Sequence, residues 1–245
     1  MQWVHPLTAH PSTNLATYFR QNSLTPDGRT IVFVSNREGG WQLFAVPEFP
    51  PRDIVQLTGG APLHPSSPAI DPAGERVFFA RDGGLSGLSL ATLEERCVVD
   101  YGTASIGECL LDPAGRWLVA ACKQGENSGL PVGRTDGADW RWIPFPRTVI
   151  HPQFHQADPE WLLFAGPPAP HMHRVRQDGT GLECLSPNDD EEFAVHETFL
   201  GATGRVTYTV WPPELRVVDW QTPEPRTIAW FNVCHITPNP AGRAC

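Results

Sequence analysis

The amino-acid sequence predicts an all-β fold, a β-propeller of four-stranded blades with about five complete blades and a partial one in its 245 residues. One turn phrase recurs along the chain at steps of 46, 41, 45, 44 and 38 residues. A short apolar run of strand length follows the turn, and no stretch keeps the 3.6-residue apolar period of an amphipathic helix. Repeats of about 40 to 45 residues with four short strands each are typical of propeller blades.

The recurring phrase is a turn in which a small polar residue and proline come before glycine. Proline fixes φ at the first turn position, and glycine supplies the positive φ that the chain needs before the next strand. The fourth repeat has Glu160 where the others have glycine. In chain order, the turns with the residues that follow them read LTPDGRTIVFVSN, IDPAGERVFFARD, LDPAGRWLVAACK, QADPEWLLFAG, LGATGRVTYTVWP and TPNPAGRAC.

The segments between these turns supply the remaining strands of each unit. Two of them read as strand, turn and strand, WQLFAVPEFPPRDIVQLTGG and LSGLSLATLEERCVVD. A pair of β-sandwiches also offers short strands with regular turns. Sandwiches do not repeat one turn phrase at a fixed spacing, so the repeat favours the propeller.

We assign residues 1–245 to a single β-propeller domain. The sixth turn phrase has begun when the sequence reaches Cys245, and a propeller ring must close to protect the edges of its strands. We therefore expect the final blade to be incomplete here, with its other strands following Cys245.

Composition excludes several classes of partner. The formal net charge of −9 argues against nucleic acid or an anionic membrane surface as the main partner, because both require a basic face. No apolar run approaches the roughly 20 residues of a membrane span. The six cysteines form no CxxC pair and no signal peptide is visible, so we expect reduced thiols and a cytoplasmic location. The oligomeric state is not predicted.

Histidine and glutamine recur at one place in the repeats, seven to ten residues before the turn. The innermost strand of a blade lines the central channel, so residues at equivalent positions of successive blades converge there. We therefore expect six channel residues, namely Gln21, His64, His151, Gln153, His196 and His235.

Clustered imidazoles facing one cavity suit either a divalent metal ion or acid–base chemistry, because neutral histidine is both a metal ligand and a base near neutral pH. The alternative is structural, since polar residues at the start of a strand often do no more than bond the backbone of the next blade. Both interpretations stay open on the sequence pattern alone.

Five stretches resemble the oligogalacturonate lyases, a family of cytoplasmic seven-bladed propellers that split pectin-derived oligogalacturonides by β-elimination. The resemblance runs from about Leu7 to Gly242, and its most specific part is His-Pro-Gln-Phe at His151, followed 45 residues later by His196 and Glu197. The stretches are LTAHPSTNLATYFRQNSLTPDGRTIVFVSNREGGWQLFAVP, QLTGG, HPQFHQADPEWLLFAG, VRQDGTG and VHETF. The turn phrases themselves are shared with TolB-type, WD40-like propellers.

The resemblance implies a metal-assisted β-elimination of oligogalacturonides, with Mn²⁺ or another divalent cation as cofactor. His151 matches the base of the family and His196 matches one metal ligand. Gln153 and His235 fall at family-like positions near the channel. The family's remaining ligands, a Gln and a His-x-His, are expected after Cys245. Its catalytic arginine is expected in the blade before His151, where Lys123 and Arg134 are the candidates.

A second hypothesis treats the same channel as a binding site without turnover. Many propellers bind a carbohydrate or a protein in this way, and a fold does not by itself fix a function. In that case the chain is a non-catalytic TolB-type propeller that binds its ligand in the central channel.

Overall fold

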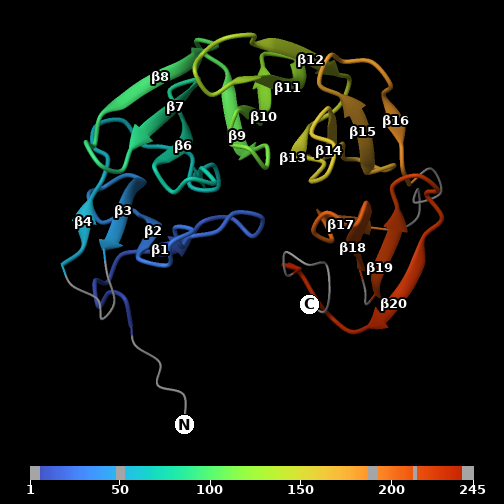
Figure 1. The fold of residues 1–245 in the computed structure, drawn as a ribbon, viewed down its shortest axis with the longest axis horizontal. Helices are drawn as coiled ribbons and strands as arrows, with labels where there is room; N and C mark the ends of the chain where they lie inside the picture. Colours follow the sequence, from blue (N-terminus) through green and yellow to red (C-terminus); the bar gives the residue numbers. More distant parts are fainter. Residues whose placement is uncertain (1–5, 48–52, 187–192, 212–213, 239–245) are drawn as a thin grey trace.

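The computed structural model describes residues 6–47, 53–186, 193–211 and 214–238, and these form an all-β propeller of five four-stranded antiparallel blades, as the sequence predicts (Figure 1). Within each blade the strands lie side by side in chain order, with the first strand innermost. The turn predicted at Gly242 lies outside the described residues. The described part of the chain holds no helix that is able to cross a membrane.

The blades follow one another around the ring, and each has four strands. Blade 1 comprises β1 (Asn14–Ala16), β2 (Thr30–Ser35), β3 (Gln42–Pro47) and β4 (Val55–Gln56). Blade 2 comprises β5 (Ala69–Ile70), β6 (Arg76–Arg81), β7 (Gly84–Ser89) and β8 (Glu95–Asp100). Blade 3 comprises β9 (Ser105–Leu111), β10 (Trp117–Gln124), β11 (Asn127–Arg134) and β12 (Arg141–Phe145). Blade 4 comprises β13 (Ile150–Phe154), β14 (Trp161–Ala165), β15 (Met172–Arg176) and β16 (Glu183–Cys184). Blade 5 comprises β17 (Phe193–Phe199), β18 (Arg205–Trp211), β19 (Glu214–Asp219) and β20 (Arg226–Trp230).

The repeated turn joins the first strand of a blade to the second. In blade 3 the Gly115 amide donates to the Asp112 carbonyl at 2.9 Å, and the Asp112 carboxylate accepts the amides of Arg116 at 2.6 Å and Trp117 at 2.7 Å. Gly115 has a φ of +67°, and a Cβ there would lie 2.8 Å from Cδ of Pro72 in the turn of blade 2. The turn phrase therefore fixes the blade internally and also packs neighbouring turns together.

The core consists of face-to-face contacts between neighbouring blades. Alternate residues of a strand point to opposite faces, so Leu118 and Ala120 of β10 pack toward blade 2, whereas Val119 and Ala121 pack toward blade 4. Burial on both faces explains why the second strand of blades 1 to 4 is largely a continuous apolar run. In β18 the buried hydroxyls of Thr207 and Thr209 donate to backbone carbonyls instead. The first strand is the one whose residues face the channel.

We predict that Phe78→Ala lowers the free energy of unfolding by about 3 to 5 kcal/mol, because Phe78 is 1% exposed between blades 2 and 3 and its removal leaves a cavity. Urea unfolding followed by tryptophan fluorescence measures the change. Leu182→Ala is the control, since Leu182 is 48% exposed, and it should shift stability by less than about 0.5 kcal/mol. Equal effects of the two substitutions would contradict this account of the core.

Candidate active site

Three successive innermost strands carry the same irregularity. In β9, β13 and β17, two residues stand opposite one residue of the neighbouring strand, which is the geometry of a β-bulge. His151 and His196 are the first residues of the bulges in blades 4 and 5, with φ of +57° and +58°. Few non-glycine residues adopt positive φ, and those that do cluster at functional sites. The bulges turn three pairs of residues out of the regular ladder, each with a polar side chain: Gly107 and Glu108, His151 and Pro152, His196 and Glu197.

Blade 1 supplies a loop in place of a bulge. Residues 17–23 separate the pair of Ala16 with Phe33 from the bridge of Leu24 with Ile31, so the innermost strand is interrupted there. The loop closes on itself because the Thr17 amide donates to Oγ of Ser23 at 2.8 Å. Figure 1 shows it, in blue, reaching from blade 1 toward the centre of the ring. The sequence Tyr-Phe-Arg-Gln is thereby delivered to the channel.

One carboxylate oxygen joins the loop to the bulges. Oε2 of Glu108 accepts Nη2 of Arg20 at 2.8 Å and the backbone amide of His151 at 2.8 Å. The side chains of Arg20 and Glu108 are only 3% and 15% exposed. Burial lowers the pKa of Arg20, and the charge of Glu108 acts against that shift. The pair therefore keeps a cation inside a protein whose net charge is negative.

The imidazole of His151 is buried between two carboxylates and a phenol. Its Nε2 lies 3.9 Å from Oε1 of Glu108 and 3.4 Å from the hydroxyl of Tyr18, and its Nδ1 lies 3.6 Å from Oε1 of Glu197. Burial raises the pKa of Tyr18, and Glu108 raises it further, so this phenol stays protonated at neutral pH. Nε2 therefore faces a carboxylate and a phenol, and Nδ1 faces the second carboxylate.

Four buried polar atoms around His151 have no hydrogen-bond partner in the described structure. They are Nε and Nη1 of Arg20, Nδ1 of His151 and Oε1 of Glu197. Buried polar groups are nearly always paired with protein or water, and an unpaired group calls for an explanation. Four such atoms around one imidazole are the polar lining expected of a site that receives a ligand.

A second histidine cluster lies beside the first. A ring nitrogen of His196, Sγ of Cys234 and a ring nitrogen of His235 lie within 4.8 Å of one another. Burial lowers the pKa of His196 to about 4, and the nearby imidazoles of His235 and His151 add to this shift. Burial also lowers the pKa of His235. Both rings are therefore neutral near pH 7, the state in which imidazole binds a metal ion.

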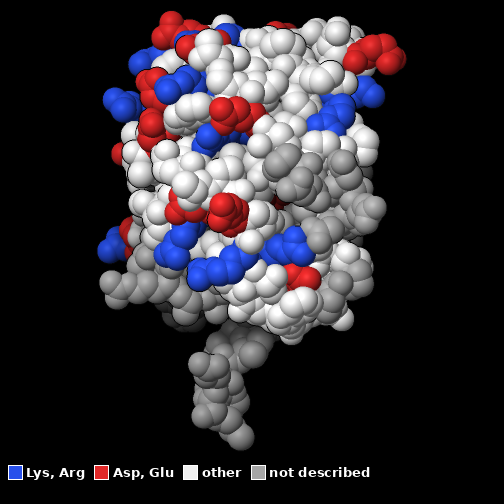
Figure 2. Space-filling view, turned by 90° about the vertical axis from the view of Figure 1, so that its right-hand side faces the viewer, with Lys and Arg blue, Asp and Glu red and all other residues white. Residues whose placement is uncertain are grey.

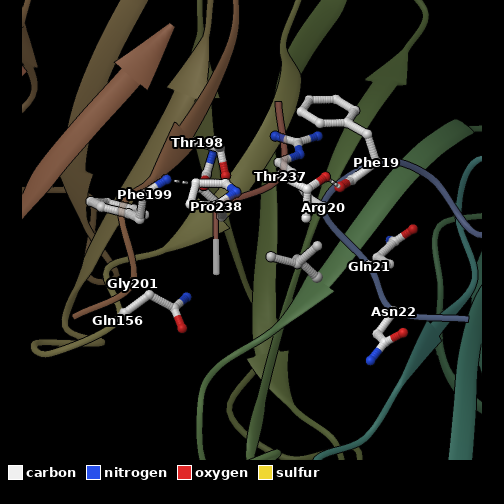
Figure 3. A pocket seen from close by; sticks show the side chains of 12 residues that line it. Phe19, Arg20, Gln21, Asn22, Gln156, Thr198, Phe199, Gly201, Thr237 and Pro238 are labelled. Carbon is white, nitrogen blue, oxygen red and sulfur yellow. Dashed lines mark hydrogen bonds between the residues drawn. The ribbon is translucent and has the colours of Figure 1, made fainter. Parts of the chain in front are cut away.

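A cavity of about 460 Å³ adjoins this arrangement. Phe19, Arg20, Gln21 and Asn22 form one wall, and Gln156, Thr198, Phe199 and Gly201 lie opposite (Figure 3). Gln153 also lines it. The volume is within the range of small-molecule sites, and Arg20 is its buried cation.

No protein-family model matches this sequence, and no curated protein matches it either. Solved structures do. An oligogalacturonate lyase in complex with manganese superposes with a TM-score of 0.86 at 21% identity, over 96% of this chain and 72% of that one. The chain has the fold of an oligogalacturonate lyase.

Two further solved structures share the propeller fold. The oligogalacturonate lyase of Vibrio parahaemolyticus gives a TM-score of 0.82 at 19% identity, over 96% of this chain and 71% of that one. TolB of Acinetobacter baumannii gives 0.60 at 11% identity, over 82% of this chain and 53% of that one. The property shared at these identities is the fold.

Within this lyase fold, the channel holds most of the predicted residues. His151, His196 and His235 lie together, with ring centroids 5.5 Å apart for the first two and 4.3 Å apart for the last two. Gln21 donates to the Cys109 carbonyl at 2.6 Å. Gln153 donates to the Glu197 carbonyl at 2.9 Å. It thus bonds the backbone of the next blade, which is the structural role expected of a polar residue without a catalytic function.

Neither of the two candidates for the catalytic cation lies beside the histidine cluster. Arg134 ends β11 and pairs with Asp136 in an exposed turn, at the end of blade 3 away from Lys123. Lys123 lines a separate pocket of about 190 Å³ that His64, Glu108 and Ile150 also line. Lys123 therefore borders the site, and Arg134 is not brought to it.

The sequence pattern gave no site role to four residues near His151, namely Arg20, Glu108, Glu197 and Cys234. Glu108 and Glu197 each stand seven residues before their turn glycine, as Gln21 and His235 do. That spacing was a usable signal for the two carboxylates. Arg20 and Cys234 lie in irregular segments, where a strand register says nothing about side-chain direction.

We predict that Glu108→Gln destabilises the protein by about 3 kcal/mol or more, because it leaves the buried guanidinium of Arg20 without its counter-charge. Adding Arg20→Met should recover part of the loss. Urea unfolding of both single variants and the double variant gives the coupling. The exposed pair Arg134 and Asp136 is the control and should show no measurable coupling. Additive effects at Arg20 and Glu108 would contradict the assignment.

Proposed function

We propose that this protein is a lyase that cleaves uronate oligosaccharides, such as pectin-derived oligogalacturonides, by β-elimination. The observation that carries the proposal is the buried imidazole of His151, which lies among unpartnered polar atoms, beside a buried arginine and next to a cluster of metal-binding side chains. The similarity in fold to oligogalacturonate lyases adds support.

The reaction needs a base, a proton donor and a cation. A base takes the proton from C5 of the uronate, and the electrons of that C–H bond form the C4–C5 double bond. The C4–O glycosidic bond breaks, and its oxygen leaves with the electron pair and takes up a proton. Because the C5 proton is acidified only when the adjacent carboxylate is neutralised, a cation must bind that carboxylate.

His151 serves as the base. Its imidazole is the buried nitrogen base of the site, and the carboxylates of Glu108 and Glu197, 3.9 and 3.6 Å from its ring nitrogens, stabilise the imidazolium that proton abstraction creates. The hydroxyl of Tyr18, 3.4 Å from Nε2, is protonated at neutral pH because its pKa is raised, and it donates its proton to the leaving oxygen.

Arg20 serves as the cation for the uronate carboxylate. One of its nitrogens is held by Glu108, and its Nε and Nη1 are buried and unpartnered, which leaves donors for a carboxylate oxygen. His196, Cys234 and His235 can hold a divalent cation. Such an ion, when bound, supplies further positive charge for a carboxylate.

The attraction for an acidic substrate comes from these few charges. On the face shown in Figure 2, basic and acidic side chains are interspersed, so no broad cationic surface gathers a polyanion there. Lys123, in the pocket beside Glu108 and Ile150, fits the carboxylate of a neighbouring sugar unit. It is the chain's only lysine, and the other 17 of its Lys and Arg residues are arginines.

The decisive experiment incubates the purified protein with tri-galacturonate and follows the ultraviolet absorbance of the unsaturated product. We predict that His151→Ala lowers the rate by about 10²- to 10⁴-fold, the usual contribution of a general base. His10→Ala, at an exposed histidine, should leave the rate unchanged. If the unaltered protein binds tri-galacturonate without forming product, the site is a binding site without turnover.

We predict that Lys123→Gln raises KM for tri-galacturonate by about 3- to 10-fold with little change in kcat, because Lys123 contributes binding away from the reacting bond. Arg29→Gln, at an exposed arginine, is the control. Because the chain has one lysine, acylation of its ε-amine followed by mass spectrometry gives a second readout. Tri-galacturonate should protect Lys123; unhindered acylation would place the substrate elsewhere.

A further inference from the structure

The cluster of His196, Cys234 and His235 contains a thiol. Sγ of Cys234 lies 4.0 Å from Nδ1 of His196, and the rings of His196 and His235 lie 4.3 Å apart at 76°. The three donor atoms fall within 4.8 Å of one another, and Cys234 is a free cysteine. Two imidazoles and one thiol thus converge on a space the size of a coordination sphere.

The three side chains come from two separate parts of the chain. The bulge of β17, with its positive φ, directs His196 out of the ladder. His235 stacks on the ring of Phe19, with centroids 4.6 Å apart and planes at 14°. The segment that follows His235 is fixed, because Ile236 is buried and the hydroxyl of Thr237 donates to the Phe19 carbonyl at 3.0 Å. The donors are therefore positioned before an ion arrives.

The identity of the donors bears on the identity of the metal. Manganese and magnesium prefer oxygen ligands, whereas thiolate selects zinc and other thiophilic ions and imidazole suits zinc, copper, iron and nickel. No carboxylate joins this cluster among the described residues. The carboxylate of Glu197, the residue after His196, has its Oε1 3.6 Å from Nδ1 of His151. The donor set does not fit manganese, the ion in the similar lyase structure.

We infer that the cluster is a site for zinc or a similarly thiophilic divalent ion, with Cys234 as the ligand that sets the preference. The inference depends on the proposed function in one respect: the bound ion would help to neutralise the carboxylate of the uronate substrate. Cysteine and histidine are the donors that zinc sites in proteins most often combine.

The test is made on the full protein after removal of metal with a chelator, under anaerobic conditions. Titration with Co²⁺, a spectroscopic substitute for zinc, should produce a near-ultraviolet sulfur-to-metal charge-transfer band. The band should disappear in Cys234→Ser and persist in Cys97→Ser, which removes an exposed cysteine of β8. A band that survives in Cys234→Ser, or no band at all, overturns the inference.

Competition between Zn²⁺ and Mn²⁺, followed by displacement of Co²⁺, gives an independent measure. Loss of a residue that merely supports a ligand costs about 10- to 100-fold in metal affinity, so Cys234→Ser should weaken zinc binding by at least that factor. Cys234→Asp supplies a hard oxygen ligand and should reduce the preference for zinc over manganese. An unchanged preference in Cys234→Asp contradicts the inference.

The two proposals fail separately. If zinc binds through Cys234 but tri-galacturonate yields no unsaturated product, the metal site stands and the lyase activity does not. If product forms and manganese is bound as tightly as zinc by the unaltered protein, the lyase stands and the thiophilic site does not.

Discussion

The channel is organised around one buried carboxylate oxygen, Oε2 of Glu108. It accepts a guanidinium hydrogen bond from the loop of blade 1 and a backbone amide from blade 4, while Glu108 itself belongs to blade 3. A carboxylate in this position must be paired, and so must a buried arginine, because either charge alone is costly in an apolar interior. The position of Arg20 and the position of His151 are therefore set by the same atom.

The regular parts of the blades and the irregular parts have different tasks. The second strand of each blade is buried on both faces and carries the packing between blades, for instance at Leu118 and Val119. The innermost strands of blades 3, 4 and 5 are bulged, and they carry the polar chemistry. Local departures from ideal strand geometry at His151 and His196 are thus supported by a scaffold whose stability lies elsewhere.

This division explains what the sequence predicted and what it did not. The turn phrase and its spacing determined the fold class, the order of the strands and the channel location of His151 and His196, since each repeat obeys the same backbone rules. Arg20 was not predicted because it lies in a seven-residue interruption of β-pairing, where periodicity gives no direction. Cys234 follows the last described strand, and its approach to His196 depends on the packing of His235 on Phe19.

The hydrogen bond from Thr237 to the Phe19 carbonyl joins residues that are 218 positions apart. Contacts of such separation incur the full entropy of loop closure and form late in folding, whereas the hairpins within each blade need only local pairing. During synthesis the blades can therefore assemble in chain order well before the channel is complete. The segment that carries Cys234 and His235 is fastened to the loop of blade 1 by this bond and by the stack on Phe19, so the histidine–cysteine cluster gains that support only in the last step.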